Sequence, residues 1–229
     1  MRASICTTLP RLPSWRRTLI WSGVFLAAVW LVTGGLSQAD QSRFGQALCL
    51  SLIMLSLVLL TGYGGDVSLC QMSFVGVGAI ITARTFHAIT PLSVVSAFLV
   101  AGAVGVLVAV PALRLRGLYL GLGTMAVAAA MDNMVFPTKL LGFRFYQGSI
   151  TIERPSLIES ERSMVMAVAV TFVLTAMVVL AIRRGKYGRI LLASRDSQAA
   201  CATLGFSTTT VRVLVFGVSA GLAGVAGVL

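Results

Sequence analysis

The sequence has few acidic residues and almost no histidine. Its 229 residues include 7 Asp and Glu and 1 His, and only 11% are charged, against about 25% in soluble domains. With His87 as the single histidine, a histidine-based metal site or a Ser-His-Asp triad would lack partners. The 57% of hydrophobic residues exclude a soluble fold around one core.

Cysteine chemistry is also poorly supported. The four cysteines, at positions 6, 49, 70 and 201, are scattered and show neither the spacing of metal ligands nor a disulfide framework. We therefore expect no catalytic residue, no metal and no cofactor bound by this chain.

What the sequence has in abundance is long apolar runs. A run of about 18 apolar residues suffices to cross a bilayer as a helix, and such runs, or runs close to that length, cover residues 18–37, 44–61, 92–110, 117–136 and 163–182. A shorter run, 72–83, and a terminal one, 211–229, complete the set. The runs lack the alternating pattern of barrel strands. The predicted fold is all-α, a polytopic transmembrane bundle of about six or seven segments.

The basic residues predict the orientation. Arg2, Arg11, Arg16 and Arg17 precede the first run, so the positive-inside rule places the N-terminus in the cytoplasm. The net charge of +11 then reflects topology and some attraction to anionic lipid rather than nucleic-acid binding. As an alternative, residues 37–39 resemble a signal-peptide cleavage site, which would remove the first segment.

Glycines and polar residues interrupt the apolar pattern at 61–78. Non-helical backbone within a membrane occurs where it is buried in protein or lines a cavity, and transporters use such breaks at substrate sites. Asp66 could contact substrate there, or it could stabilise the N-terminus of the following helix in a cytoplasmic turn. The Gly76–Gly78 pair favours close helix packing.

A second acidic residue, Asp132, lies within the 117–136 run. An acidic group in a membrane segment is a functional candidate. Asp132 also lies near the predicted outer interface, where it could be a solvated residue at the end of a helix. An integral-membrane enzyme with Asp66 and Asp132 as its acid/base pair is disfavoured, because the predicted topology places them on opposite sides of the membrane. We expect no enzyme activity in this chain.

Three motifs carry a resemblance to a known family. They are GRILLASRDSQAACATLG at 188–205 followed by a Gly/Ala-rich run to 227, GYGG with VSL at 62–69, and LRLRGLY at 113–119 with Thr124 downstream. In order and spacing they resemble the permease subunits of branched-chain amino acid ABC transporters. The resemblance covers about residues 61–229.

The resemblance implies one subunit of an ATP-driven importer in a bacterial plasma membrane. Its partners would be a second permease subunit, a dimer of cytoplasmic ATPases, an extracytoplasmic substrate-binding protein and the lipid bilayer. The sequence has no Walker A pattern, so ATP would be bound by the ATPase subunits. A cytoplasmic coupling loop, 183–210, would dock on the ATPase.

The coupling helix would use apolar side chains for contact and charged ones for orientation. The contact residues would be Ile190, Leu191, Leu192 and Leu204. The residues assigned to ATPase coupling are Gly188, Arg189, Ser194, Arg195, Asp196, Ala200, Leu204 and Gly205.

The substrate pathway is assigned to Tyr63, Asp66, Ser68, Gln71, Thr124 and Asp132. Many family members have an acidic residue five positions after the threonine that corresponds to Thr124, where this chain has Ala129. Asp132 lies on the same helical face and could replace it. Branched-chain amino acids are the default substrates, with other amino acids, amides or urea as alternatives.

The sequence ends at Leu229 inside its last apolar run, whereas relatives continue through further spans. We therefore expect a single permease domain, 1–229, that is incomplete at its C-terminus. The alternatives are a non-functional truncated permease and a channel or exporter for another small solute.

Overall fold

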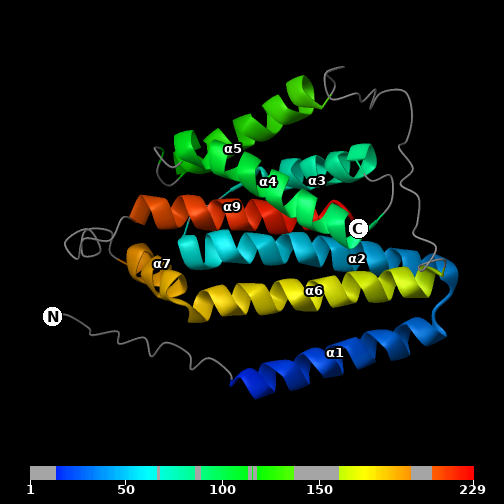
Figure 1. The fold of residues 1–229 in the computed structure, drawn as a ribbon. Coiled ribbons are helices and arrows are strands. Elements are labelled where there is room, and N and C mark those ends of the chain that lie inside the picture. Colours follow the sequence, from blue (N-terminus) through cyan, green and yellow to red (C-terminus); the bar gives the residue numbers. More distant parts are fainter. Residues whose placement is uncertain are drawn as a thin grey trace.

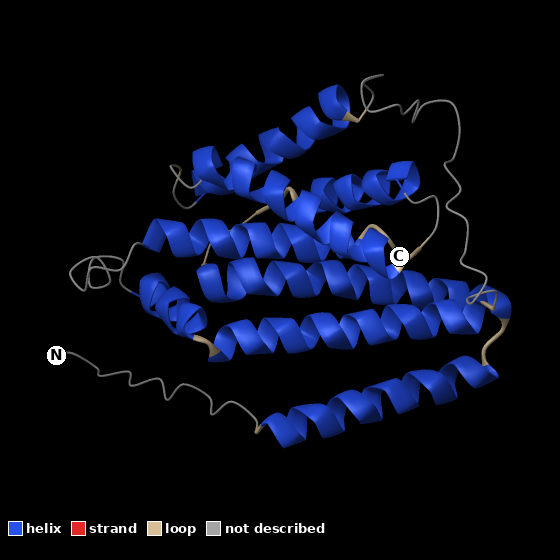
Figure 2. Cartoon of the chain, viewed as in Figure 1, coloured by secondary structure: helices blue, strands red, loops and turns tan. Residues whose placement is uncertain are grey.

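The computed structural model describes residues 14–65, 68–85, 89–112, 115, 118–136, 160–196 and 208–229. Its regular structure over these residues is entirely helical (Figure 2). The elements are α1 (Trp15–Gly35), α2 (Gln38–Leu57), η1 (Val58–Gly64), α3 (Gln71–Thr85), α4 (Pro91–Ala112), α5 (Leu118–Ala130), η2 (Met131–Val135), α6 (Glu161–Arg184), α7 (Lys186–Asp196) and α9 (Thr208–Ala226). Both η elements are π-helical.

Five helices are long and apolar enough to cross a membrane: α1, α2 with η1, α4, α6 and α9. Two further predicted segments are helical but are not among these five spans of the described residues. The helix α3 has 15 residues, or roughly 22 Å at 1.5 Å per residue, which is less than the ~30 Å hydrocarbon core. The second, α5, ends in η2. The prediction of a polytopic helical bundle is confirmed.

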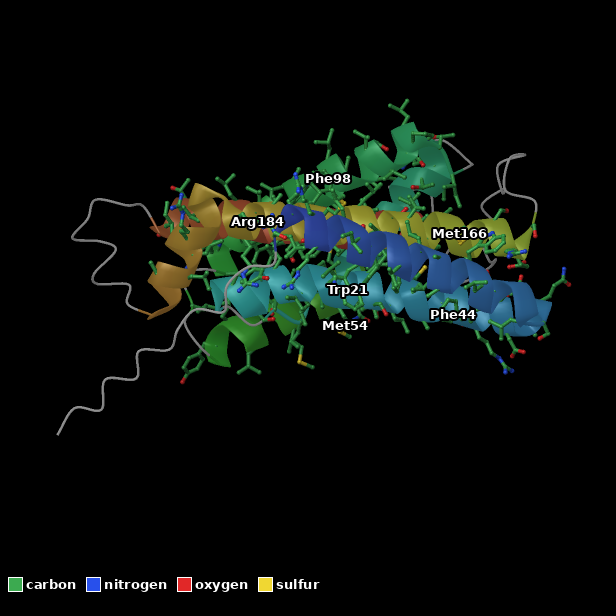
Figure 3. The ribbon with its side chains drawn as sticks, turned by 90° about the horizontal axis from the view of Figure 1, so that it is seen from below. Trp21, Phe44, Met54, Phe98, Met166 and Arg184 are labelled. Carbon is green, nitrogen blue, oxygen red and sulfur yellow. The ribbon has the colours of Figure 1, made fainter. Side chains whose placement is uncertain are left out.

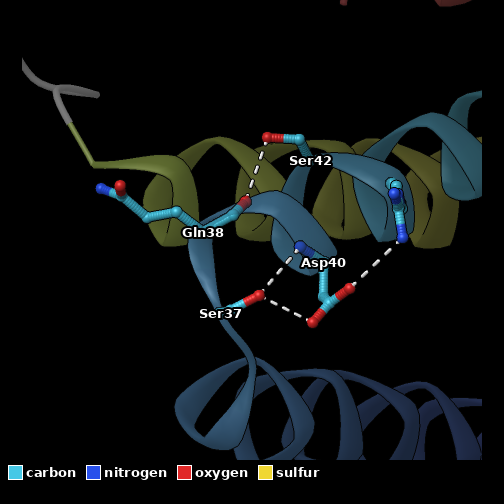
Figure 4. Close-up of polar contacts among 5 residues, drawn as sticks. Ser37, Gln38, Asp40 and Ser42 are labelled. Carbon is cyan, nitrogen blue, oxygen red and sulfur yellow. Dashed lines mark hydrogen bonds and ion pairs between the residues drawn. The ribbon is translucent and has the colours of Figure 1, made fainter.

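The start of α2 differs from the prediction, which placed it at residue 44. The helix begins at Gln38, and the Ser37 hydroxyl caps it by accepting a hydrogen bond from the Asp40 backbone N–H at 3.4 Å (Figure 4). Asp40 also accepts from the Ser37 hydroxyl at 2.7 Å and lies 3.7 Å from Arg43. Asp40, which precedes the predicted segment, therefore lies in the first turn of the helix, where an acidic side chain is favourable.

The bundle is built around α9, which packs against α2, α3 and α4, while α6 covers α2 and α1 packs on α6 (Figure 1). Among the candidate spans α9 is the most buried and α1 the least. We call the end of the bundle that carries α7 the α7 end. There α6 finishes beside the start of α1, because Arg184 lies over the Trp15 ring at 5.1 Å. At the opposite end Arg162 donates to the Trp30 carbonyl at 2.9 Å.

Glycine and alanine allow α9 to approach its neighbours backbone to backbone. A Cβ on Gly78 of α3 would overlap the backbone of Gly224, and a Cβ on Gly105 of α4 would overlap Ala220. Gly76 faces the ring of Phe136 instead, with Cζ only 2.8 Å from where its Cβ would be. The predicted packing role of Gly76 and Gly78 is thus confirmed, and it follows the small-residue rule for membrane helices.

Candidate functional site

The predicted break lies between η1 and α3. The helix runs further than predicted, through Gly64, and Gly65 then turns the chain with a left-handed φ of 73°. Its N–H bonds back to the Thr61 carbonyl at 3.2 Å. Glycine suits this position because a Cβ disfavours positive φ. The chain then returns into the bundle, and α3 starts at Gln71.

The start of α3 lies well inside the bundle. The Gln71 side chain donates to the Ser219 hydroxyl at 2.8 Å, and Ser219 donates to the Ser56 carbonyl at 2.7 Å. Ser219 is eleven positions into α9 and Ser56 is eight positions before the end of η1, so they lie roughly 16 Å and 12 Å from the α7 ends of their helices. The start of α3 at this depth favours a broken segment inside the bundle over a turn at its end.

Helix α5 also contacts the non-helical residues that precede α3. The backbone N–H of Leu69 donates to the Thr124 hydroxyl at 3.0 Å, and Thr124 donates to the Gly121 carbonyl at 2.9 Å. Ser68 and Cys70 contact each other at 3.2 Å between Oγ and Sγ. We call this set the buried polar cluster; its members, all buried, are Ser56, Ser68, Cys70, Gln71, Thr124 and Ser219. The Leu69 N–H of the non-helical segment is thereby paired inside the protein, as buried backbone in a membrane requires.

One atom of this cluster lacks a hydrogen bond. Gln71 is only 5% exposed, and its Oε1 has no hydrogen-bond donor among the described residues. A buried acceptor left unpaired costs about 1–3 kcal/mol. The Gln71 amide is therefore held by its Nε2 alone.

We expect Ser219→Ala to lower the free energy of unfolding by about 2 kcal/mol, because the Gln71 Nε2 then loses its acceptor in a buried site. Gln71→Met should be close to neutral, because it removes both the donor and the unpaired acceptor. Thermal unfolding of the full chain in detergent measures both. An equal loss in the two variants, with no recovery in the double variant, would contradict this account of the cluster.

Asp132 lies in a groove between α3 and the α5–η2 helix. This α3–α5 groove has a volume of about 440 Å³. Its lining residues are Met72, Ser73, Met125, Ala128, Ala129, Asp132 and Phe136. Asp132 and Ala129 therefore line one groove, as their shared helical face predicts. The groove is apolar apart from Ser73 and the exposed carboxylate of Asp132.

The groove and the buried polar cluster meet at the first turn of α3. Gln71 turns into the cluster, and the next two residues, Met72 and Ser73, line the groove. Of the predicted pathway residues, the structure brings Ser68, Gln71 and Thr124 together and places Asp132 in the adjoining groove. Tyr63 lies apart, at the α7 end, where Arg183 lies over its ring at 5.4 Å.

Helix α7 is folded back onto the bundle. Gly188 makes this possible, since a Cβ there would overlap the backbone of Ile182 and Arg183 in α6. Leu191 is fully buried in a cluster with Leu59 and Val215, so α7 contacts η1, α6 and α9. The prediction that Leu191 is a contact for a partner is wrong, because the bundle itself buries that side chain. Arg189 is exposed.

Several predicted residues fall outside what the structure describes. Asp66, Ala200, Leu204 and Gly205 are not among the described residues, and Ser194, Arg195 and Asp196 belong to α7 without described side chains.

Three members of the buried polar cluster, Ser56, Cys70 and Ser219, were missed by the sequence analysis. Ser56 lies within a plain apolar run, and Ser219 lies in a Gly/Ala-rich run that indicates packing. Serine is common in both settings, so no local pattern distinguishes them.

Comparison with known proteins supports the sequence resemblance. A family model described as the permease component of branched-chain amino acid transport systems matches residues 42–229. Comparisons with curated proteins and with solved structures gave no significant match. The match extends from α2 through α9 and includes the break, the groove and α7. The chain therefore belongs to the family of branched-chain amino acid transport permease components.

Proposed function

We propose that the chain is a transmembrane subunit of an ATP-driven importer for branched-chain or related amino acids. It would work with a second permease subunit, two ATPases and an extracytoplasmic substrate-binding protein, and ATP would be bound by the ATPases alone. The observation that carries the proposal is the position of α7. This short helix packs against η1, which leads into the break, and against α9, whose Ser219 holds the start of α3.

Side-chain contacts connect α7, through η1 and α9, to the proposed substrate path. Leu191 is buried between η1 and α9, and the Arg183 guanidinium lies over Tyr63 of η1. Farther along α9, Ser219 holds Gln71 at the start of α3. A rigid-body shift of α7 would therefore move the elements on which the buried polar cluster depends, as packed helices transmit small displacements.

Charge supports a cytoplasmic location for the α7 end and for the N-terminus. The basic residues of the described chain that belong to this end outnumber those of the opposite end. They are Arg16, Arg17, Arg183, Arg184, Lys186, Arg189, Arg195 and Arg212, against Arg43, Arg84 and Arg162. Because cytoplasmic segments carry the excess of Lys and Arg, α7 would face the ATPases. The membrane would be a bacterial plasma membrane.

The α3–α5 groove supports an amino acid as substrate. A carboxylate at Asp132 would attract an α-ammonium group, and Met72, Met125 and Phe136 would contact an apolar side chain. Methionine side chains adapt to several shapes, so related amino acids would share the groove. The first turn of α3 beside it has the positive end of the helix dipole, which favours a substrate carboxylate.

The docking step tests the proposal. Arg195→Glu combined with Leu204→Asp should weaken ATPase association at least about tenfold, since each ~1.4 kcal/mol of lost contact is a factor of ten. ATP-dependent uptake of labelled leucine by the reconstituted complex should fall in parallel. Arg43→Glu is the control for the charge reversal, because this exposed side chain lies near the start of α2, at the end of the bundle opposite α7.

Unchanged ATPase association and uptake in the first variant, with normal expression, would overturn the proposal. Uptake by the chain alone without ATP would indicate a channel or exporter for a small solute instead. Association without any uptake would indicate a permease that does not transport.

A further inference from the structure

An apolar crevice separates α1 from α6 in the half of the bundle next to the α7 end. It has a volume of about 220 Å³ and is lined by Thr18, Trp21, Ser22 and Phe25 of α1 and Phe172, Val173, Ala176, Met177 and Leu180 of α6. The rings of Phe25 and Phe172, 5.6 Å apart, close its inner end. Only small hydroxyls interrupt its apolar lining.

Arginines surround the other end of the crevice. Arg184 lies over the Trp15 ring at 5.1 Å, and its Nη2 donates to the Thr18 hydroxyl at 3.5 Å, so its guanidinium lies at the mouth (Figure 3). Arg17 is exposed and lies one helical turn before Trp21, on the side of the crevice. Exposed Arg16 adds a further charge. The mouth is strongly positive.

The described carboxylate side chains near α1 and α6 lie at the opposite end of the pair. Asp40 lies in the first turn of α2, and Glu161 accepts a hydrogen bond from Ser42 at 3.3 Å at the start of α6. Among the described side chains, negative charge therefore lies at one end of the α1–α6 pair and positive charge at the crevice. The positive charge at the crevice mouth favours an anionic headgroup over a neutral one.

We propose that the α1–α6 crevice binds an anionic phospholipid from the leaflet that borders the α7 end. An acyl chain lies between α1 and α6, because apolar cavities do not hold water and an empty crevice forfeits dispersion contacts. The phosphate lies at the mouth, where guanidinium groups bind it in a bidentate manner. The indole of Trp15 lies at the headgroup level, as interfacial tryptophans do. The lipid thereby joins α1 to the rest of the bundle.

Lipid binding to the purified full chain tests this site. We expect phosphatidylglycerol to bind more tightly than phosphatidylcholine in native mass spectrometry, and to raise the midpoint of thermal unfolding more. Arg17→Gln combined with Arg184→Gln should weaken phosphatidylglycerol binding roughly 30-fold, since each basic residue near the headgroups contributes a factor of about five. Ala176→Phe fills the crevice, keeps every charge and should weaken binding of both lipids.

The opposite end of the same helix pair provides the control. Arg162 lies over Trp30 at 4.7 Å, as Arg184 lies over Trp15. Arg43→Gln combined with Arg162→Gln removes the same charge there and should leave phosphatidylglycerol binding unchanged. Equal weakening by both pairs, or no effect of Ala176→Phe, would overturn the proposal. Competition by the water-soluble headgroup, glycerophosphoglycerol, would overturn it too, since it would indicate a free-phosphate site.

Discussion

Gly224→Val is expected to disrupt the centre of the bundle. A Cβ on Gly224 overlaps Ala101 of α4 and lies 3.0 Å from the Ala97 carbonyl oxygen, while Gly78 of α3 approaches the Gly224 backbone from another side. No flexible side chain can move away to make room, since the obstacles are backbone atoms and a methyl group. Overpacking of this kind costs about 3 kcal/mol.

Thermal unfolding of the full chain in detergent measures the effect. For a chain of this size, about 3 kcal/mol corresponds to a decrease of roughly 6–12 °C in the unfolding midpoint. Gly23→Val is the matched control, because the same change in α1 meets no atom within 4 Å. If the two variants unfold at the same temperature, α9 does not pack against α4 as described.

Asp132→Asn is expected to have the largest effect on transport. If the carboxylate binds the substrate ammonium, the neutral amide loses a charge-assisted hydrogen bond of about 1.5–3 kcal/mol. The apparent KM for leucine uptake should then rise roughly 10–100-fold, while expression and ATPase association stay normal. If the transporter also takes up uncharged solutes such as urea, Asp132→Asn should leave that uptake unchanged.

Moving the carboxylate to a neighbouring position in the same groove gives a more specific test. Ala129 and Asp132 line the same groove, so Ala129→Asp in the Asp132→Ala background should restore part of the uptake. Asp40→Asn is the control, because it neutralises a half-buried carboxylate in the first turn of α2, outside the groove. An unchanged KM in Asp132→Asn would exclude the carboxylate from the substrate path.

Helix positions were largely predictable because hydrophobicity is a local property. The runs at 92–110 and 163–182 became α4 and α6 with small shifts at their ends. Helix boundaries were less predictable, because the polar residues that cap a helix resemble the polar residues of a loop. Ser37 and Asp40 look like loop residues in isolation. At the start of α2, however, the Ser37 hydroxyl accepts from the Asp40 N–H and donates to the Asp40 carboxylate.

Site residues were predictable only in part, for a related reason. Ser68 and Thr124 were recognised from the motifs that contain them, and Gln71 from its place in the polar interruption at 61–78. Their hydrogen-bond partners were not, because Ser219 lies 148 positions after Gln71 and pairing over such a distance leaves no periodic signal. Leu191 was assigned to the wrong surface, since an amphipathic helix does not indicate by itself whether its apolar face meets a partner or its own bundle.

The sequence by itself determined that this chain is a helical membrane protein and indicated its family. Composition and the length of the apolar runs determine that it is a helical membrane protein, because hydrocarbon admits only segments whose backbone is satisfied internally. The family is indicated by the order and spacing of the motifs. Only the tertiary structure decided where α3 begins, what holds Gln71 and which atoms surround Asp132. These features depend on contacts between helices far apart in the chain, where glycine and alanine let the backbones approach and buried serines replace water as hydrogen-bond partners.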